Sequence, residues 1–159
     1  MEKAHWHKHY EECDKYCPMH PDYKKPIKKG PYKVAIVGSR EFTDYSIVKE
    51  ALDNIKDKIA LIISGGAKGV DTLAQRYACE NGIPIHIYYP NYSKYGKKAP
   101  FVRNVVIANL AEYMIAFGHM DSKGTRHVVN KMKELNKPYM FFQFMGNGVG
   151  VETNLIEGL

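Results

Sequence analysis

The amino-acid sequence predicts a doubly wound α/β fold, in which a five-stranded parallel sheet carries helices on both faces. Five short apolar runs, rich in β-branched and aromatic residues, alternate with four segments whose apolar residues recur at helical spacing. Three of these runs end in glycine-containing turns, and in an open α/β sheet the turns that follow the strands lie at the edge where ligands bind. A length of 159 residues without an internal repeat fits one such domain.

The elements can be placed in order along the chain. The predicted strands are residues 33–37, 59–63, 84–89, 113–117 and 138–144. Thr43 or Asp44 can cap the first helix, because a side-chain oxygen at that position accepts an unpaired backbone N–H. The later helices are predicted at residues 70–81, 100–111 and 125–135, with Gly82 ending the first of these three. Right-handed crossovers then favour the strand order 3-2-1-4-5, with strands 1 and 4 beside the switch point.

Composition narrows the class of protein. Hydrophobic residues make up 45% and charged residues 25% of the chain, as in soluble globular proteins. No apolar run approaches the roughly 20 residues of a membrane span, and the charged N-terminus lacks the apolar region of a secretory signal. With three cysteines, we expect a cytoplasmic protein without disulfides and without a membrane partner. The net charge of +6 favours anionic ligands but is weak evidence for DNA binding.

The chain divides into three parts. Residues 1–32 form an N-terminal appendage and linker rich in His, Cys and Lys, and half of the excess positive charge lies within the first 33 residues. Residues 33–144 form the α/β domain. Residues 145–159, which begin with several glycines, are expected to be a flexible tail or an oligomer arm.

The sharpest local motif is GGAKGVD, directly after the second strand. Gly65, Gly66 and Gly69 allow a ligand to approach the backbone closely, with Ala67 between them. The helix that follows offers free N–H groups and the positive end of a dipole, which suit a phosphate. Asp71 either caps this helix or binds a ribose hydroxyl, and the alternative for the whole motif is a tight structural turn.

The other two glycine turns are weaker signals. Gly38, Ser39 and Arg40 follow the first strand, where Ser39 can donate to a phosphate oxygen and Arg40 can bind one in a bidentate manner, unless it pairs with a nearby acid. The stretch from Gly118 to Thr125 leads into a helix. In this stretch Gly124 and Thr125 resemble a phosphate cradle, to which Lys123 adds charge, although an ordinary loop and helix cap would look similar. Neither a Walker A motif nor a GxGxxG dinucleotide fingerprint is present.

A polar loop and its following helix add further candidates. Arg103 and Asn104 open the helix after this loop, and an Arg in a first turn works against the helix dipole, so we expect it to face an anion rather than solvent. Tyr92 and Tyr95 in the loop either stack on a base or pack against the protein.

These motifs together carry a family resemblance. GSREFTDY, GGAKGVDTLAQRYACENGIP, FVRN and KGT follow one another at a spacing similar to that of the SLOG superfamily, which is named for the Smf/DprA and LOG proteins. The YspA-like branch is the nearest in pattern, and the resemblance covers residues 33–142. It implies a Rossmann-like domain that binds nucleotides or nucleotide-derived signalling ligands, in some relatives during conflict between bacteria and phages. Carried over by position, the ligand-facing residues are Gly38, Ser39, Arg40, Gly65, Gly66, Ala67, Asp71, Arg103, Asn104, Gly124 and Thr125.

The chain departs from the LOG enzymes at their catalytic position. Those enzymes carry PGGxGTxxE, and here the position of the glutamate is Val128 and the PGG is missing. Since a valine moves no proton and stabilises no oxocarbenium ion, LOG-type hydrolysis is not expected. Asp71, Glu112 or Asp121 could supply a carboxylate, but the sequence selects none of them, so the catalytic residues are unknown.

The appendage contains zinc-type ligands at His5, His7, His9, Cys13, Cys17 and His20. A straight helix would place His9 and Cys17 roughly 12 Å apart, too far for one metal ion. The expectation is therefore an amphipathic helix without a metal and no required cofactor, and the alternative is zinc held by Cys13, Cys17 and His20.

Three functions remain open at this stage. The first is binding of a nucleotide-derived small molecule as a sensor, carrier or sponge. The second is hydrolysis of an N-glycosidic or phosphate bond in such a ligand. The third is binding of single-stranded DNA as in DprA-like proteins, since bases stack on tyrosines. A homodimer is expected because related domains often pair through helices.

Overall fold

The sheet of this protein contains six strands in the order β3-β2-β1-β4-β5-β6, in a computed structural model that describes residues 32–119, 121–145 and 148–154. The strands are β1 (Tyr32–Gly38), β2 (Ile59–Ser64), β3 (Ile85–Ile87), β4 (Tyr113–Gly118), β5 (Tyr139–Met145) and β6 (Gly148–Thr153). The first five are parallel, whereas β6 runs antiparallel to β5. The predicted doubly wound class and the order of the first five strands are confirmed.

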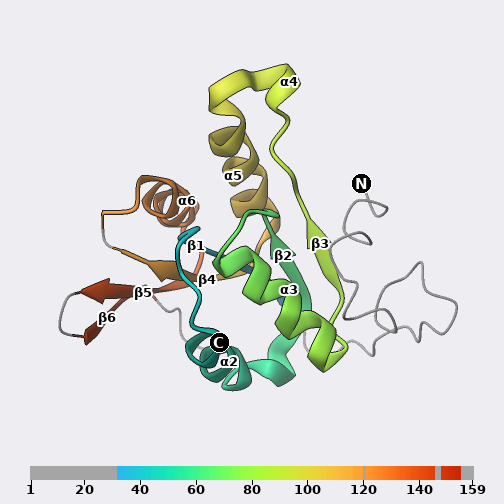
Figure 1. Cartoon of the computed structure of the whole chain (residues 1–159), viewed down its shortest axis with the longest axis vertical. Helices are drawn as coiled ribbons and strands as arrows, with labels where there is room; N and C mark the ends of the chain where they lie inside the picture. Colours follow the sequence, from blue (N-terminus) through green and yellow to red (C-terminus); the bar gives the residue numbers. More distant parts are fainter. Residues whose placement is uncertain (1–31, 120, 146–147, 155–159) are drawn as a thin grey trace, which may run out of the picture.

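Helices cover both faces of the sheet (Figure 1). They are α2 (Tyr45–Asp53), α3 (Val70–Asn81), α4 (Tyr92–Tyr95), α5 (Ala99–Leu110) and α6 (Lys123–Glu134), with short 3-10 turns η2 (Lys56–Lys58) and η3 (Gly96–Lys98). Residues of α2 and α3 pack in the hydrophobic cluster on one face, and residues of α5 and α6 pack in the cluster on the other. None of the helices in the described part of the chain has the length and hydrophobicity needed to cross a bilayer.

The ends of two helices confirm the predicted caps. Asp44 caps α2, because its carboxylate accepts the N–H of Ser46 at 3.1 Å. Gly82 ends α3 in the left-handed conformation, with φ of 63°, which costs glycine little. Other boundaries differ by one or two residues from prediction, and the polar loop after β3 contains the unpredicted α4 and η3.

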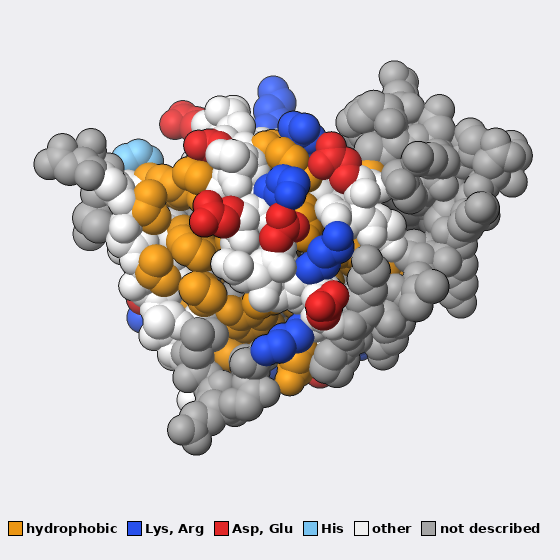
Figure 2. All heavy atoms as spheres, turned by 90° about the horizontal axis from the view of Figure 1, so that it is seen from below, with side chains coloured by type: hydrophobic (Ala, Val, Ile, Leu, Met, Phe, Trp, Pro, Cys, Tyr) orange, Lys and Arg blue, Asp and Glu red, His pale blue; other side chains and the backbone are white. Residues whose placement is uncertain are grey.

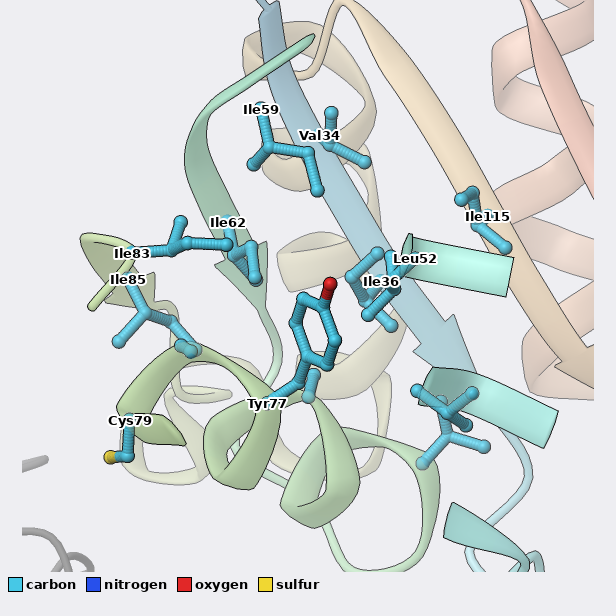
Figure 3. Packing of buried hydrophobic residues seen from close by; sticks show 14 of the residues in the cluster. Val34, Ile36, Leu52, Ile59, Ile62, Tyr77, Cys79, Ile83, Ile85 and Ile115 are labelled. Carbon is cyan, nitrogen blue, oxygen red and sulfur yellow. The ribbon is translucent and has the colours of Figure 1, made fainter. Parts of the chain in front are cut away.

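The core on the α2 and α3 face is built around Tyr77 of α3, a fully buried side chain. Figure 3 shows its ring lying between α3 and the strands, near Ile36 of β1 and Ile62 of β2. Its hydroxyl donates to Asp53 of α2 at 2.7 Å, which satisfies the polar end of the side chain. This contact joins α2 and α3 above the strands that carry two of the glycine turns.

Strand β6 corrects the expectation of five strands, and it lies where we expected a flexible tail. The sequence GVGVET contains only two large apolar side chains, and its glycines obscured the alternation of a strand. Besides its antiparallel ladder with β5, the strand is held by Glu152, whose carboxylate accepts from Arg126 at 2.9 and 3.1 Å, from Tyr139 at 2.8 Å and from Gln143 at 3.2 Å. Lys133 adds an ion pair at 3.1 Å.

The other side of β5 and β6 is less well covered. Val149 and Val151 are about half exposed, at 49% and 50%, and Phe142 and Phe144 are only partly buried. Figure 2 shows hydrophobic side chains gathered where β5 and β6 lie in Figure 1, beside a surface of mixed charges.

We predict that Glu152→Gln weakens the attachment of β6. Hydrogen bonds from Arg126 and Tyr139 outweigh burial and lower the pKa of Glu152 to about 2, so its charge stabilises the fold above its unfolded pKa near 4.5. The variant should lose about 2 kcal/mol of unfolding free energy at neutral pH, and the difference should shrink as the pH falls from 4.5 towards 2. Denaturant unfolding measures this, with Glu134→Gln on the exposed face of α6 as the control that should change little. Equal losses in both variants would contradict the role of Glu152.

Candidate functional site

The three glycine turns meet at the carboxyl edge of the sheet, beside the switch point between β1 and β4. The N–H of Ser39 donates to the carbonyl of Phe117 at 2.9 Å, which ties the turn after β1 to the end of β4. A Cβ at Gly38 would clash with the Phe117 carbonyl and with the Val70 side chain. Gly38 is therefore needed so that β1, β4 and α3 can approach one another at the base of the site.

A pocket of about 440 Å³ opens between these turns, within the size range of small-molecule sites. We call it the inner pocket. It is lined by Val37, Gly38, Ser39, Arg40, Glu41, Gly65, Ala67, Asp71, Pro100, Phe101, Arg103, Asn104, Ile107, Ser122, Gly124, Thr125 and Val128.

A second hollow of about 660 Å³ adjoins the inner pocket and shares part of its wall. We call it the outer hollow. It is lined by Arg40, Gly65, Gly66, Ala67, Lys68, Tyr89, Pro90, Tyr92 and Arg103.

Asp71 is the buried acid of the inner pocket, with 5% of its surface exposed. Its carboxylate accepts the N–H of Ala67 at 3.0 Å and so braces the GGAKG loop. Burial raises the pKa of Asp71 to about 6, although the hydrogen bond from Ala67 and the charges of Arg103 and Arg40 oppose the rise. Of the two readings of Asp71, the helix cap is wrong, because Gly69 is the N-cap of α3 and Asp71 lies within its first turn.

Arg103 belongs to the wall that the inner pocket and the outer hollow share, together with Arg40, Gly65 and Ala67. Its Nη1 donates to the carbonyl of Gly65 and, at 3.4 Å, to that of Tyr88, and its Nε donates to the Asn104 side chain at 3.1 Å. Burial lowers the pKa of Arg103, and the neighbouring charge of Asp71 acts in the opposite direction. Because α5 begins at Ala99, Arg103 lies in its second turn, and the dipole argument from the sequence does not apply.

The start of α6 presents an anion-binding arrangement to the inner pocket. Ser122 is the N-cap, but its hydroxyl donates to the Thr125 hydroxyl at 3.0 Å, and no side chain in the described part of the chain caps the backbone amides of the first turn. That turn contains no acid. Unpaired amides at a helix N-terminus favour an anion, and here they adjoin a pocket with Arg40 and Arg103 in its wall.

The N-terminus of α3 is less available to a bound anion than the sequence indicated. The N–H of Val70 donates to the carbonyl of Ser39 at 3.2 Å, and Asp71 lies in the first turn. Gly69 has φ of 72°, and a Cβ there would clash with the carbonyls of Ser39 and Arg40. Its role is therefore to let α3 pack against the turn after β1.

Most of the residues selected from the sequence gather around the inner pocket. Gly66 lines only the outer hollow, while Gly69, Gly118 and Lys123 line neither cavity. Sequence reasoning did not select Glu41, Phe101 and Ser122, although each lies inside a motif or stretch that the sequence analysis identified. Of the candidate carboxylates, Glu112 accepts the N–H of Lys33 at 2.9 Å near the start of β1, and Asp121 does not line the pocket.

The metal hypothesis falls outside the described residues, since Cys13, Cys17 and His20 precede residue 32. Within the described ranges, no group of three or more His, Cys, Asp or Glu side chains is arranged to hold a metal ion.

Comparisons with known proteins support the α/β fold and the resemblance to the SLOG superfamily. Residues 32–95 match the model of the YspA, cpYpsA-related SLOG family. The resemblance to the SLOG superfamily and its YspA-like branch is therefore confirmed. The chain is also 29% identical over 119 residues to the Gene 61 protein of Mycobacterium phage D29, across 69% of this chain and 95% of the phage protein.

Two solved structures share the fold. The DNA processing protein A (DprA) of Streptococcus pneumoniae is 23% identical, with a TM-score of 0.61 over 76% of this chain. DprA of Helicobacter pylori, whose structure is described for its single-stranded DNA binding mode, is 22% identical, with a TM-score of 0.59 over the same share. The matched region spans 53% of the first DprA chain and 69% of the second.

We predict that Asp71→Asn makes the isolated protein more stable at neutral pH. Because the folded-state pKa of Asp71 is raised to about 6, its charged form destabilises the fold above that pH, and an amide removes this cost. The gain should be about 2 kcal/mol near pH 7.5 and should fall towards zero below about pH 3, where the wild-type side chain is protonated in both the folded and the unfolded state.

Denaturant unfolding at both pH values measures this effect. Asp53→Asn is the matched control, since hydrogen bonds from Lys49 and Tyr77 lower the pKa of Asp53, and that variant should lose stability at neutral pH. A destabilised Asp71→Asn variant at neutral pH would show that the buried charge is needed for folding rather than for a ligand.

Proposed function

We propose that this protein binds a nucleotide or a nucleotide-derived ligand in the inner pocket, with a phosphate at the start of α6. One observation carries the proposal. The uncapped first turn of α6, the Ser39 turn and the Arg103 side chain surround a single cavity of about 440 Å³ at the switch point of the sheet. Such a cavity offers amide, hydroxyl and guanidinium donors to one anion, and ligands of open α/β sheets bind at this place.

Binding without hydrolysis is favoured by the position of Val128. Its side chain is buried and lines the inner pocket, at the place where the LOG pattern has its glutamate. The carboxylates that do line the pocket are Asp71 and Glu41. Asp71 braces Ala67 beside Arg103, which fits a role in holding the loop and a ligand hydroxyl. We therefore propose a sensor, carrier or sponge, and keep hydrolysis as an outcome that the experiment can detect.

Single-stranded DNA is the second candidate ligand. The shared fold with the H. pylori DprA structure favours it, as do exposed basic and aromatic side chains beyond the outer hollow. Lys94, Lys97, Lys98 and Tyr95 are exposed on α4 and η3, and a strand of nucleic acid binds such a surface through its phosphates and bases.

Gly124→Asp is the variant that tests the proposed phosphate site. A Cβ at Gly124 would meet nothing within 4 Å, and an acid in the first turn of a helix is compatible with the dipole, so the fold should be kept. The new carboxylate would instead repel a bound phosphate and should weaken binding at least about tenfold. Gly124→Asn has the same size without the charge and should bind nearly as the wild type does.

The measurement uses the full chain and a mixed pool of nucleotides, NAD, ADP-ribose and cyclic nucleotides. Gel filtration followed by mass spectrometry of the bound and free fractions identifies what is retained. An intact compound retained by the wild type and by Gly124→Asn, but lost from Gly124→Asp, is the expected result. A consumed compound would establish hydrolysis instead. If nothing is retained and salt-sensitive binding to single-stranded DNA is found, the second candidate replaces the first.

A further inference from the structure

The outer hollow differs chemically from the inner pocket that it adjoins. Flat apolar side chains, Tyr89, Pro90 and Tyr92, line it together with the cations Arg40 and Lys68. None of the described residues that line it carries a carboxylate. A surface that combines aromatic rings with positive charge suits a planar, electron-rich group attached to an anion, and it disfavours both a cationic ligand and a purely apolar one.

The inner wall of the outer hollow is closely packed. Gly66 has φ of 72°, and a Cβ there would lie 2.8 Å from Cδ1 of Tyr89 and 2.8 Å from Cγ2 of Ile87. The GGAKG backbone therefore packs directly against the Tyr89 ring. This contact gives Gly66 a role that the inner pocket alone does not explain.

The outer wall is formed by Tyr92, which is 54% exposed and is the first residue of α4. Asn91 caps this short helix by accepting the N–H of Lys94 at 3.1 Å, which sets the position of Tyr92. Tyr92 and Arg103 both line the outer hollow. An exposed tyrosine at the edge of a basic hollow offers a ring that a ligand can cover.

Arg103 connects the outer hollow with the inner pocket. Its Nη1 and Nε are used in hydrogen bonds to Gly65, Tyr88 and Asn104, which fix the plane of the guanidinium. Its Nη2 donates to no partner among the described residues. The guanidinium is half-buried, is held in one orientation and lies in the wall that both cavities share. Its two remaining N–H donors are suited to the phosphate of a ligand that extends from one cavity into the other.

We propose that the outer hollow is the base subsite of this protein: the base of a nucleotide stacks between Tyr89 and Tyr92, while its phosphoribosyl part passes Arg103 into the inner pocket. The inference rests on the proposed function, because it assumes a phosphate in the inner pocket. It adds that a base strengthens binding, and that the base is recognised by stacking, so that different bases are tolerated.

The test compares three probes that share a phosphoribosyl group: 5′-AMP, 5′-UMP and ribose 5-phosphate, which lacks a base. Affinities are measured by calorimetry for the full-length wild type, Tyr92→Leu and Tyr95→Leu. Tyr92→Leu keeps an apolar side chain but removes the ring. Tyr95→Leu is the matched control, because Tyr95 belongs to the same short helix, is 39% exposed and lines neither cavity.

The wild type should bind both nucleotides at least about tenfold more tightly than ribose 5-phosphate. Tyr92→Leu should remove about five- to tenfold of that preference and leave the affinity for ribose 5-phosphate unchanged, while Tyr95→Leu should behave as the wild type. Equal wild-type affinities for all three probes, or a preference that survives Tyr92→Leu, would overturn the base subsite and leave the phosphate site standing. Failure of all three probes to bind would overturn the proposed function and the base subsite together.

Discussion

The contact between Arg103 and the carbonyl of Gly65, next to the buried Asp71, is the interaction on which the site depends. It brings the turn after β2, the second turn of α5 and the end of β3 to one place. Asp71 holds the same turn from the other side through Ala67. Burial disfavours the charge of Asp71 and raises its pKa to about 6, and the neighbouring Arg103 charge offsets only part of this cost. The GGAKG loop is therefore held by an arginine and an aspartate rather than by glycines alone.

The glycines of the three turns serve two different purposes. Gly38 and Gly69 permit close packing among β1, β4 and α3, since a Cβ at either position would clash with backbone atoms. Gly124 has open space around it, and it lies where the amides of α6 adjoin the inner pocket. The helix N-terminus available to an anion is therefore that of α6, whereas the first amide of α3 is already bonded to Ser39. This division was not visible in the sequence, where the turn before α3 was the strongest candidate for a phosphate site.

The strands and their order were predictable because the apolar runs are continuous and the crossovers are constrained. The bounds of α3 were predicted to the residue, because Gly82 ends the helix. Strand β6 was missed because Glu152 stabilises it through hydrogen bonds from Arg126 and Tyr139, which belong to other elements. A local sequence pattern does not reveal such contacts. Arg103 was selected for a wrong reason, since α5 begins earlier than expected. The structure instead gives it a position between two cavities.

The central claim is that a nucleotide phosphate binds at the start of α6, and amide chemical shifts of the ¹⁵N-labelled protein test it most directly. On addition of the nucleotide retained from the mixed pool, the amides of Lys123, Gly124 and Thr125 should show the largest shifts, because a phosphate would accept from the first turn of this helix. Shifts confined to the exposed residues of α4 and η3 would contradict the account, and they would place the ligand on the basic surface beyond the pocket.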